Sequence, residues 1–379
     1  MSGAVSDPAS GLASAQETTG AILADTIALA RIPAPAGQEH DRIAWLDRRL
    51  RRGPGDLHHD EAGNLHWTFG RPPFELMLLV HVDTVFGADL DHEPSLRDGW
   101  LHGPGTGDNT VAITTAVHVT ERLAGAIAAP LAVVFTTGEE GLGGLRGARH
   151  ACATVDARQV IALEGHGLDA VFTEAIGCLR VELTIAGPGG HSWWDRGRPS
   201  AAHELVRLLG RLLDAVPAGV AVNVGIVQAG AAVNAIAGHA RALVEGRALD
   251  EQSLEQLFRL IFELAGQGER PAAAQVLDRR PAGRIGREHP LTAAVLEVRR
   301  GLGLGERLAD GSTDANAALA AGRPALALGC VRGADMHSPA ERIQIASIAL
   351  GAAQLEGVLA RLLAGQAEPM IATTVRDQP

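Results

Sequence analysis

The chain has 379 residues, of which 46% are hydrophobic and 20% charged, as in folded globular proteins, and it is long enough for two domains. Its net charge of −11 argues against nucleic acids and anionic membrane surfaces as partners, because both require basic patches. No apolar run reaches the roughly 18–20 residues that span a bilayer. We therefore expect small molecules or short peptides as partners, with no nucleic acid and no membrane.

The first twenty residues lack the basic start and apolar centre of a secretory signal and carry Asp7 and Glu17 instead. We expect a cytoplasmic protein with a loosely structured leader. The three cysteines, Cys152, Cys178 and Cys330, have neither CxxC nor zinc-site spacing, so we interpret them as buried apolar residues.

The first half of the chain has the alternating pattern of an α/β fold. Helical spacing of apolar residues covers 18–31 and 40–52. Three short apolar runs follow, with helical stretches at about 110–124 and 142–153 between them: Leu76–Val80, Leu131–Phe135 and Val160–Leu163. Runs without polar residues are typical of strands buried on both faces, so we predict a largely parallel sheet.

The pattern changes near residue 176. Strands are predicted at 179–185, 220–227 and 240–248, and helices at 201–215 and 252–265, which together make a compact α+β unit. The α/β pattern then resumes with helices at 290–301 and 313–321, a strand at 325–328 and a long helix through 341–363. We therefore predict a discontinuous catalytic domain, 1–175 plus 286–379, with a domain inserted at 176–285, and a mobile tail after Gly365.

Polar residues stand directly after the predicted parallel strands, where ligands bind in such sheets. His81 and Asp83 follow the first run, and their spacing lets the carboxylate orient the imidazole, although one HxD is equally consistent with a structural role. Glu164 ends the third run, where burying an unpaired carboxylate is costly and a metal would relieve that cost.

Two glycine-rich loops supply further carboxylates. Asp108 lies in GPGTGDN before a helix, where a helix N-cap is the more ordinary interpretation. Glu139 and Glu140 lie in TTGEEG and could be a solvated surface pair, but adjacent carboxylates repel each other and also suit a cation site. In a metal hydrolase one can ligate while the other takes a proton from water, so we assign Glu140 as ligand and Glu139 as general base.

His337 lies in MHSP, again beyond a predicted strand; a lone histidine is usually structural, so only its convergence with the other residues promotes it. Five ligands exceed what one open zinc site needs, so we predict two divalent ions bridged by Asp108, most readily Zn²⁺, with Mn²⁺ or Co²⁺ as alternatives. The predicted ligands are two histidines and three carboxylates: His81, Asp108, Glu140, Glu164 and His337.

The motifs HVDTV, GPGTGDNT, TTGEEGLGG, ALEGHG, GPGGHS, VNAIA, GSTDAN and MHSPAE, in this order, resemble those of the M20 family of metallopeptidases. That family includes glutamate carboxypeptidases, aminoacylases and succinyl-diaminopimelate desuccinylase. The resemblance spans residues 81–341 and implies a zinc-exopeptidase-like catalytic domain with an inserted dimerisation or lid domain. It implies the same five ligands, with Asp83 behind His81 and Glu139 as the catalytic base.

The resemblance also implies roles for the inserted domain. In a homodimer, His191 of GPGGHS would assist at the oxyanion in the partner's site, while Asn234 and Arg247 would read the substrate and hold its carboxylate. Glu164, where family aminopeptidases typically have Asp, favours a carboxypeptidase or N-deacylase. The sequence departs from the family pattern in GDNT, in VEGR and in the tandem Trp193–Trp194, which could line an acyl or aromatic pocket or pack at an interface.

Together these inferences predict a metal-dependent hydrolase of the amide bond in an N-acyl amino acid or small peptide, acting through a metal-bridging water activated by Glu139. One alternative is a hydrolase of a non-peptide C–N bond, such as an amidine or aryl amine, with the same site. Another is a non-catalytic binding protein with this fold, which predicts decay of the ligand set; the sequence retains every expected ligand.

Overall fold

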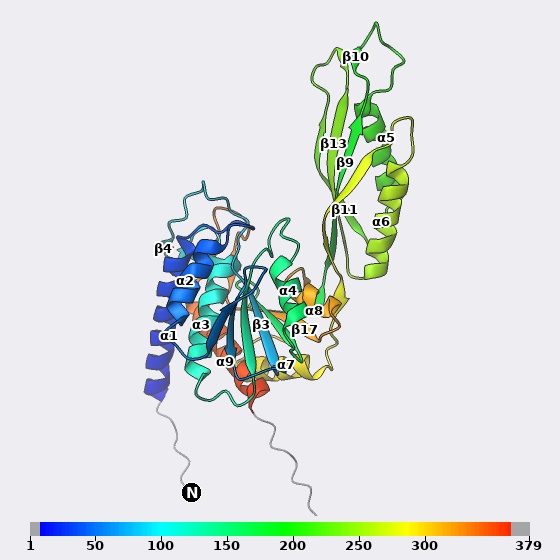
Figure 1. The fold of residues 1–379 in the computed structure, drawn as a ribbon. Coiled ribbons are helices and arrows are strands. Elements are labelled where there is room, and N and C mark those ends of the chain that lie inside the picture. Colours follow the sequence, from blue (N-terminus) through cyan, green and yellow to red (C-terminus); the bar gives the residue numbers. More distant parts are fainter. Residues whose placement is uncertain (1–7, 365–379) are drawn as a thin grey trace, which may run out of the picture.

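The computed structural model describes residues 8–364. Within them, nine strands form one mixed sheet in the order β1-β2-β6-β3-β7-β17-β8-β15, with β16 beside β8 (Figure 1). The central strands run parallel to one another: β6 (Leu131–Thr136), β3 (Leu76–His81), β7 (Val160–Glu164) and β17 (Ala325–Gly329). The predicted α/β fold with a parallel sheet is confirmed for this centre.

The edges of the sheet are mostly antiparallel and were not predicted. β1 (Asp56–His59) and β2 (Leu65–Phe69) form a hairpin beside β6, and β8 (Val171–Ala175) and β15 (Gly283–Arg284) lie at the other edge. β16 (Leu308–Gly311) pairs with β8 in parallel. These strands are short and mix polar with apolar residues, so they lack the continuous apolar run that marks a central strand.

Helices cover both faces of the sheet, which explains why its central strands are apolar throughout. On β3, Leu78 packs into the core on one face and Leu79 into the core on the other. The first face is covered by α1 (Pro8–Ala30), α2 (His40–Leu50), α3 (Ala112–Leu123), α7 (Pro290–Gly301) and α9 (Ile348–Leu363). The second is covered by α4 (Arg146–Thr154) and α8 (Ala315–Ala320).

Two predictions about the ends of the catalytic region were wrong. Residues 8–20 belong to helix α1 and are not a loose leader. The last helix begins at Ile348, because β19 (Arg342–Gln344) pairs with β5 (Trp100–His102) in a small sheet with β4 (Ser95–Arg97) and β18 (Gly333–Ala334). The predicted mobile tail after Gly365 lies outside the described residues.

One helical stretch among residues 8–364, Ile345–Leu363, is long and apolar enough to cross a membrane by length and composition. Its α9 part packs against α1, α3 and α7, and residues such as Leu355 and Leu359 belong to the main core. We therefore interpret it as a core helix.

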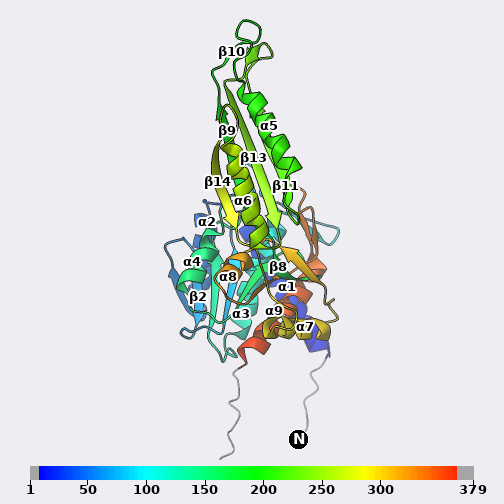
Figure 2. The same cartoon turned by 90° about the vertical axis from the view of Figure 1, so that its right-hand side faces the viewer.

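Residues 177–280 build a second sheet that projects from the first (Figures 1 and 2). Its order is β11 (Ala221–Ala229), β13 (His239–Ala248), β9 (Gly177–Ala186) and β14 (Ala273–Arg280). Helices α5 (Ala201–Asp214) and α6 (Glu251–Ala265) cover one face and share with it a core that contains no residue of the first sheet. On this basis we propose that 176–285 is an inserted domain, called the insert below.

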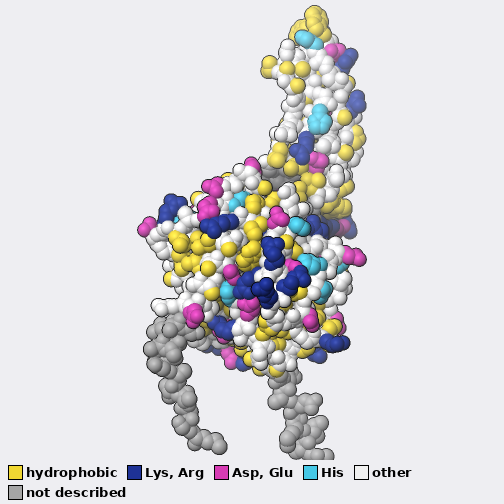
Figure 3. Space-filling model, turned by 60° about the vertical axis from the view of Figure 1, so that its left-hand side comes forward, with side chains coloured by type: hydrophobic (Ala, Val, Ile, Leu, Met, Phe, Trp, Pro, Cys, Tyr) yellow, Lys and Arg dark blue, Asp and Glu magenta, His cyan; other side chains and the backbone are white. Residues whose placement is uncertain are grey.

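The far end of the insert, called the tip, is a loop region held by a short pair of strands. β10 (Gly190–His191) pairs with β12 (Ala235–Ile236), so that His191 lies opposite Ala235. Figure 3 shows hydrophobic side chains exposed at this end of the molecule. Trp193 and Trp194 are 62% and 77% exposed there.

Candidate metal centre and active site

Three parallel strands carry predicted site residues to one edge of the main sheet. His81 is the last residue of β3, Glu164 is the last residue of β7, and Glu139 and Glu140 follow β6. The carboxyl ends of parallel strands meet at the same edge, as expected for a ligand site. A cavity of about 330 Å³ lies there, with these residues in its wall together with side chains of the insert.

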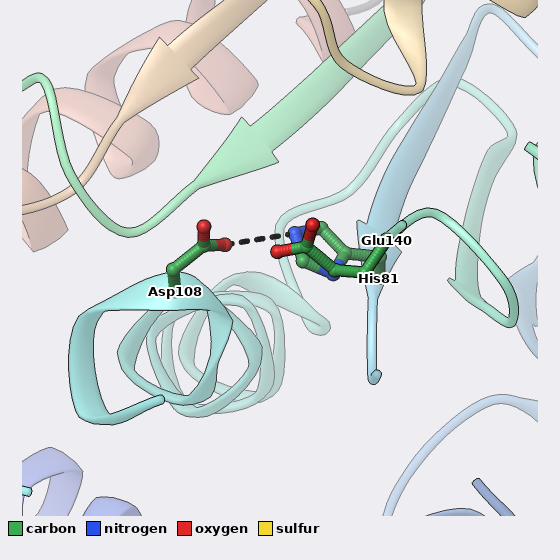
Figure 4. Close-up of side chains that lie close together, drawn as sticks. All are labelled: His81, Asp108 and Glu140. Carbon is green, nitrogen blue, oxygen red and sulfur yellow. Dashed lines mark ion pairs between the residues drawn. The ribbon is translucent and has the colours of Figure 1, made fainter. Parts of the chain in front are cut away.

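His81, Asp108 and Glu140 point toward one another in Figure 4, from the end of β3, the loop before α3 and the loop after β6. One ligating atom from each lies within 4.8 Å of the others, and no other such group of His, Cys, Asp or Glu occurs in the part of the chain that the structure describes. His81 Nε2 lies 3.1 Å from Asp108 Oδ1 and 3.4 Å from Glu164 Oε2. The structure therefore brings four of the five predicted ligands together.

His337 is the fifth, and it reaches the cluster from the loop before β19. Its Nε2 lies 2.9 Å from Asp108 Oδ2 and 3.3 Å from Glu140 Oε1. Asp108 thus has one imidazole at each oxygen, the arrangement expected of a bridging carboxylate. His337 has a φ of +62°, which costs a non-glycine residue about 1 kcal/mol or more, so the surrounding loop holds it in this conformation.

The loop that carries Asp108 is not a helix cap. A π-type turn spans Thr106–Val111, the backbone at Asp108 is not helical, and α3 begins at Ala112 with no side-chain cap hydrogen bond. The N-cap interpretation of Asp108 is wrong, because the turn directs its carboxylate to the histidines.

Glu341 fixes this loop, and our reading of the sequence did not single it out. Its side chain is fully buried and accepts hydrogen bonds from the backbone N–H groups of Gly105, Gly107 and Asp108 at 2.7–2.9 Å. His166 Nε2 lies 2.9 Å from the same carboxylate. The only local signal was its place four residues after His337, in MHSPAE.

The glycine in ALEGHG lets two site loops approach closely. A Cβ at Gly165 would collide with the carbonyl oxygen of Gly107, which belongs to the Asp108 turn. The absence of a side chain directly after Glu164 therefore allows the end of β7 to lie against that turn.

Asp83 orients the site differently from the prediction. His81 Nδ1 lies 3.1 Å from the backbone oxygen of Asp83 but 3.6 Å from its carboxylate. The carboxylate instead accepts hydrogen bonds from the backbone N–H groups of Glu139 and Glu140, at 3.1 and 2.7 Å. Asp83 therefore positions the loop that carries both glutamates, as well as the imidazole.

The two adjacent glutamates point to different partners. Glu140 faces His337, whereas Glu139 Oε1 accepts a hydrogen bond from Arg280 Nη1 at 2.8 Å. Arg280 also donates to the backbone oxygen of Glu139, and both side chains are buried. The solvated-pair interpretation is therefore wrong, because the insert covers Glu139.

The cluster concentrates charge in a buried space. Burial opposes a charged imidazole, but contacts with Asp108 and Glu164 raise the pKa of His81 well above its ordinary value. Asp108 and Glu140 raise the pKa of His337 to about 10. Burial raises the pKa of Glu140 and of Glu164.

The donor set fits a divalent ion. Asp108 Oδ1 is buried and accepts no hydrogen bond, although His81 Nε2 lies 3.1 Å away. Two ligands of one tetrahedral zinc ion, with bonds of about 2.0–2.1 Å, stand about 3.3 Å apart. The mixture of imidazoles and carboxylates also matches the preference of zinc and its neighbours in the periodic table.

Of the three substrate-facing residues predicted in the insert, one lies in the cavity. Arg247, near the end of β13, lines the cavity wall beside Arg180 and Arg280. His191 and Asn234 lie exposed at the tip, beyond the other end of β13. At about 3.3 Å per residue, His239 and Arg247 are separated by roughly 26 Å along that strand. A single chain therefore does not bring Asn234 and Arg247 together.

The sequence profile of the peptidase family M20/M25/M40 matches residues 77–361. An acetylornithine deacetylase from Myxococcus xanthus is 33% identical over 180 residues, which are 44% of this chain and 46% of that protein. The chain thus matches about half the length of that relative.

Solved structures give the same fold. A tripeptidase from Staphylococcus aureus has a TM-score of 0.77 at 21% identity, covering 92% of this chain and 99% of that one. An M20 family metallo-carboxypeptidase from Sulfolobus solfataricus has a TM-score of 0.77 at 14% identity, covering 90% and 99%. The family profile covers well over half of the chain and confirms the resemblance found in the motifs. The chain belongs to peptidase family M20/M25/M40, whose members are metal-dependent hydrolases of amide bonds.

Proposed function

We propose that the protein hydrolyses the amide bond of an N-acyl amino acid or small peptide that carries a free carboxylate near the scissile bond. The observation that carries this proposal is the position of Arg247, which lies in the same cavity as Glu139 and the five clustered histidines and carboxylates. A guanidinium group binds a carboxylate through two parallel hydrogen bonds, so it can orient an amino-acid substrate.

The charges around Arg247 support this role. Three arginines of the insert line the cavity: Arg180, Arg247 and Arg280. Within the insert they share only two carboxylate partners, Glu245 and Asp278. The insert therefore brings net positive charge to the cavity. Arg247 has Glu245 as its ion-pair partner, and its side chain is 41% exposed. It is accessible to an incoming anion, whereas Arg280 is buried against Glu139.

The residues of the catalytic domain would act at the scissile carbonyl. Divalent ions held by His81, Asp108, Glu140, Glu164 and His337 would supply Lewis acidity and lower the pKa of water. Glu139 takes the proton from the attacking water and delivers it to the leaving amine. Burial raises the pKa of Glu139 well above its ordinary value, while the charge of Arg280 opposes that increase. A carboxylate with a raised pKa is a stronger base for that transfer.

We further propose that a cytoplasmic homodimer completes the site, with His191 and Asn234 acting on the substrate of the partner subunit. Two observations at the tip support the shared site. Both residues are exposed, and Ser192 N donates to Asn234 O at 3.0 Å, so the two lie side by side at the tip. A dimer that delivered His191 would also deliver Trp193 and Trp194, which would contact an aromatic or extended acyl group.

The test is a substrate panel with metal-reconstituted protein and chelated protein as control. The panel pairs N-acetyl amino acids and dipeptides with versions whose carboxylate is converted to an amide, and adds amidine and aryl amine substrates. We expect turnover of the free acids, at least tenfold less turnover of their blocked versions, and none after chelation. Equal rates on the blocked substrates, or turnover only of the amidines or aryl amines, would overturn the proposal.

A further inference from the structure

Two arginines of the insert contact residues 139–141, called the catalytic loop below, which carry the proposed base and one proposed metal ligand. Arg280 donates to both the side chain and the backbone oxygen of Glu139. Arg180 Nη1 donates to the backbone oxygen of Gly141, on the other side of Glu140. The insert therefore holds the catalytic loop at both of its ends.

The catalytic domain holds the same loop through the opposite groups of its backbone. Asp83 accepts hydrogen bonds from the N–H groups of Glu139 and Glu140, whereas the two arginines bind carbonyl oxygens. Gly138 and Gly141 have φ values of +69° and +58°, a conformation that glycine adopts without a steric cost. Because glycine is also the least restricted residue, the loop depends on these outside contacts for its shape.

Carboxylates on both neighbouring strands hold Arg180 in place. It lies on β9, directly opposite Glu245 of β13 and Asp278 of β14. Its Nε lies 2.8 Å from Glu245 Oε2, and its Nη1 lies 2.9 Å from Asp278 Oδ2. Its side chain is 19% exposed, so solvent screens these ion pairs less than it would on an open surface. The guanidinium group therefore meets the catalytic loop in a fixed position.

Arg247 shares Glu245 with Arg180 but does not contact the catalytic loop. Its Nε lies 2.8 Å from Glu245 Oε1, and within residues 8–364 Glu245 is its only hydrogen-bond partner. It is the more exposed of the two arginines, at 41%. One carboxylate thus joins an arginine that is open to the substrate to an arginine that holds the loop.

We propose that Arg180 is a positioning residue, which keeps Glu139 and Glu140 in place by holding the catalytic loop. This role rests on the proposed function, in which Glu139 is the base. Arg180 acts on turnover and Arg247 on substrate binding, although both side chains line one cavity. The insert is thereby part of the catalytic apparatus of its own subunit.

The experiment compares two substitutions of Arg180. Arg180→Met removes the charge and keeps an unbranched side chain. Arg180→Lys supplies an ammonium group to Asp278 and the Gly141 oxygen, the two partners of Nη1, and gives up the contact of Nε with Glu245. Arg241→Met is the matched control, because Arg241 lies on β13 outside the cavity and pairs with Glu182.

Two measurements are made on each metal-reconstituted protein. The first is kcat and KM on an N-acyl amino acid that the wild type hydrolyses and on its version with a blocked carboxylate. The second is hydrogen exchange of the backbone amides of residues 138–147, followed by mass spectrometry without substrate. Exchange in α6 serves as the internal reference, because faster exchange there would report unfolding of the insert and not loosening of the loop.

We expect Arg180→Met to lower kcat about tenfold or more on both substrates, because a small displacement of the base is costly, while KM stays within about threefold. Exchange in the loop should be at least about threefold faster, with exchange in α6 unchanged. Arg180→Lys should recover most of the lost kcat. Arg241→Met should behave as the wild type does.

Wild-type kcat and loop exchange in Arg180→Met would overturn the proposal. A loss confined to the substrate with a free carboxylate would also overturn it, because Arg180 would then be a second substrate-binding arginine. If no protein, the wild type included, hydrolyses any substrate, the proposed function fails. The exchange rates then decide by themselves whether Arg180 holds the loop.

Discussion

Polar residues are held in opposite ways at two places in the molecule. One is the floor of the cavity, which is formed by Glu139 and the five clustered residues His81, Asp108, Glu140, Glu164 and His337. The other is the tip of the insert. On the floor, His81 ends a buried strand, and Asp108 is held by Glu341 through its backbone and by His337 through its carboxylate. At the tip, His191 and Asn234 are exposed, and their hydrogen bonds join them to the loop around them. Within one chain, the floor is assembled and the tip faces solvent.

This difference indicates that the two regions have different requirements for function. A site built from strand ends on a rigid sheet needs only an ion and a substrate to act. Exposed polar groups on a loop do not position a substrate until a second surface covers them. Substitutions on the floor should have the larger effects, because each one breaks a defined contact.

The largest expected effect is that of Glu139→Gln. The amide keeps the shape of the side chain but cannot accept the proton of the attacking water, so kcat should fall about 10³-fold. Zinc content, measured by atomic emission, should remain that of wild type, because Glu139 faces Arg280 and not the histidines. Glu288→Gln, on the exposed surface, is the control. Half the wild-type rate in Glu139→Gln would remove this residue from the base role.

Glu341→Gln should weaken metal binding without altering a proposed ligand. A neutral amide cannot accept all the backbone N–H groups that Glu341 now binds, so the Asp108 turn should loosen. Loss of such a supporting contact costs about 10- to 100-fold in metal affinity. Zinc titration against a competing chelator measures the change, and excess zinc should restore turnover. Wild-type affinity would show that the turn holds its shape without Glu341.

Arg247→Ala should act on the substrate and not on the metal. Losing a charged pair with a carboxylate costs about 2 kcal/mol, so kcat/KM should fall roughly 30-fold for free acids. Substrates with a blocked carboxylate should be unaffected. Arg241→Ala is the matched control, because it removes an arginine of the same strand that is paired with Glu182. An equal loss on both kinds of substrate would argue against carboxylate recognition.

The smallest effect concerns pH and Glu245. Burial opposes its charge, but hydrogen bonds from Arg247 and Arg180 lower the pKa of Glu245 to about 2. A carboxylate whose pKa is lower in the folded protein than in the unfolded one stabilises the fold at pH values above its unfolded-state pKa, which is 4.5 here. This stabilisation disappears as the pH falls towards 2, the pKa of Glu245 in the folded protein. Glu245→Gln should therefore cost under about 1 kcal/mol at pH 6 and less at pH 3, measured by urea unfolding. A difference that does not change with pH would contradict this.

The floor could be predicted from sequence because its residues follow buried apolar runs. His81, Glu139, Glu140 and Glu164 each follow a stretch that reads as a central strand, so the topology of a parallel sheet brings them together. The order of the motifs in the family then supported assignments that single residues left open.

The supporting contacts could not be predicted, because they join segments far apart in the chain. Arg280 reaches Glu139 across 141 residues, and Glu341 reaches Asp108 across 233. Arg280 also stands at the end of β14, whose sequence AAQVLDRR ends in polar residues and lacks the regular alternation that marks a strand. Arg280 belongs to no local pattern that would separate it from an ordinary surface charge, and the only mark on Glu341 is its place at the end of MHSPAE.

The most direct test of this account asks whether the tip of one subunit serves the floor of another. Glu139→Gln and His191→Ala proteins, each expected to be inactive alone, are mixed in equal amounts and allowed to exchange subunits. Half of the dimers should then be mixed, and each should hold one intact floor facing one intact tip. We predict recovery of about one quarter of the wild-type rate. Full activity of His191→Ala alone, or no recovery in the mixture, would contradict the account.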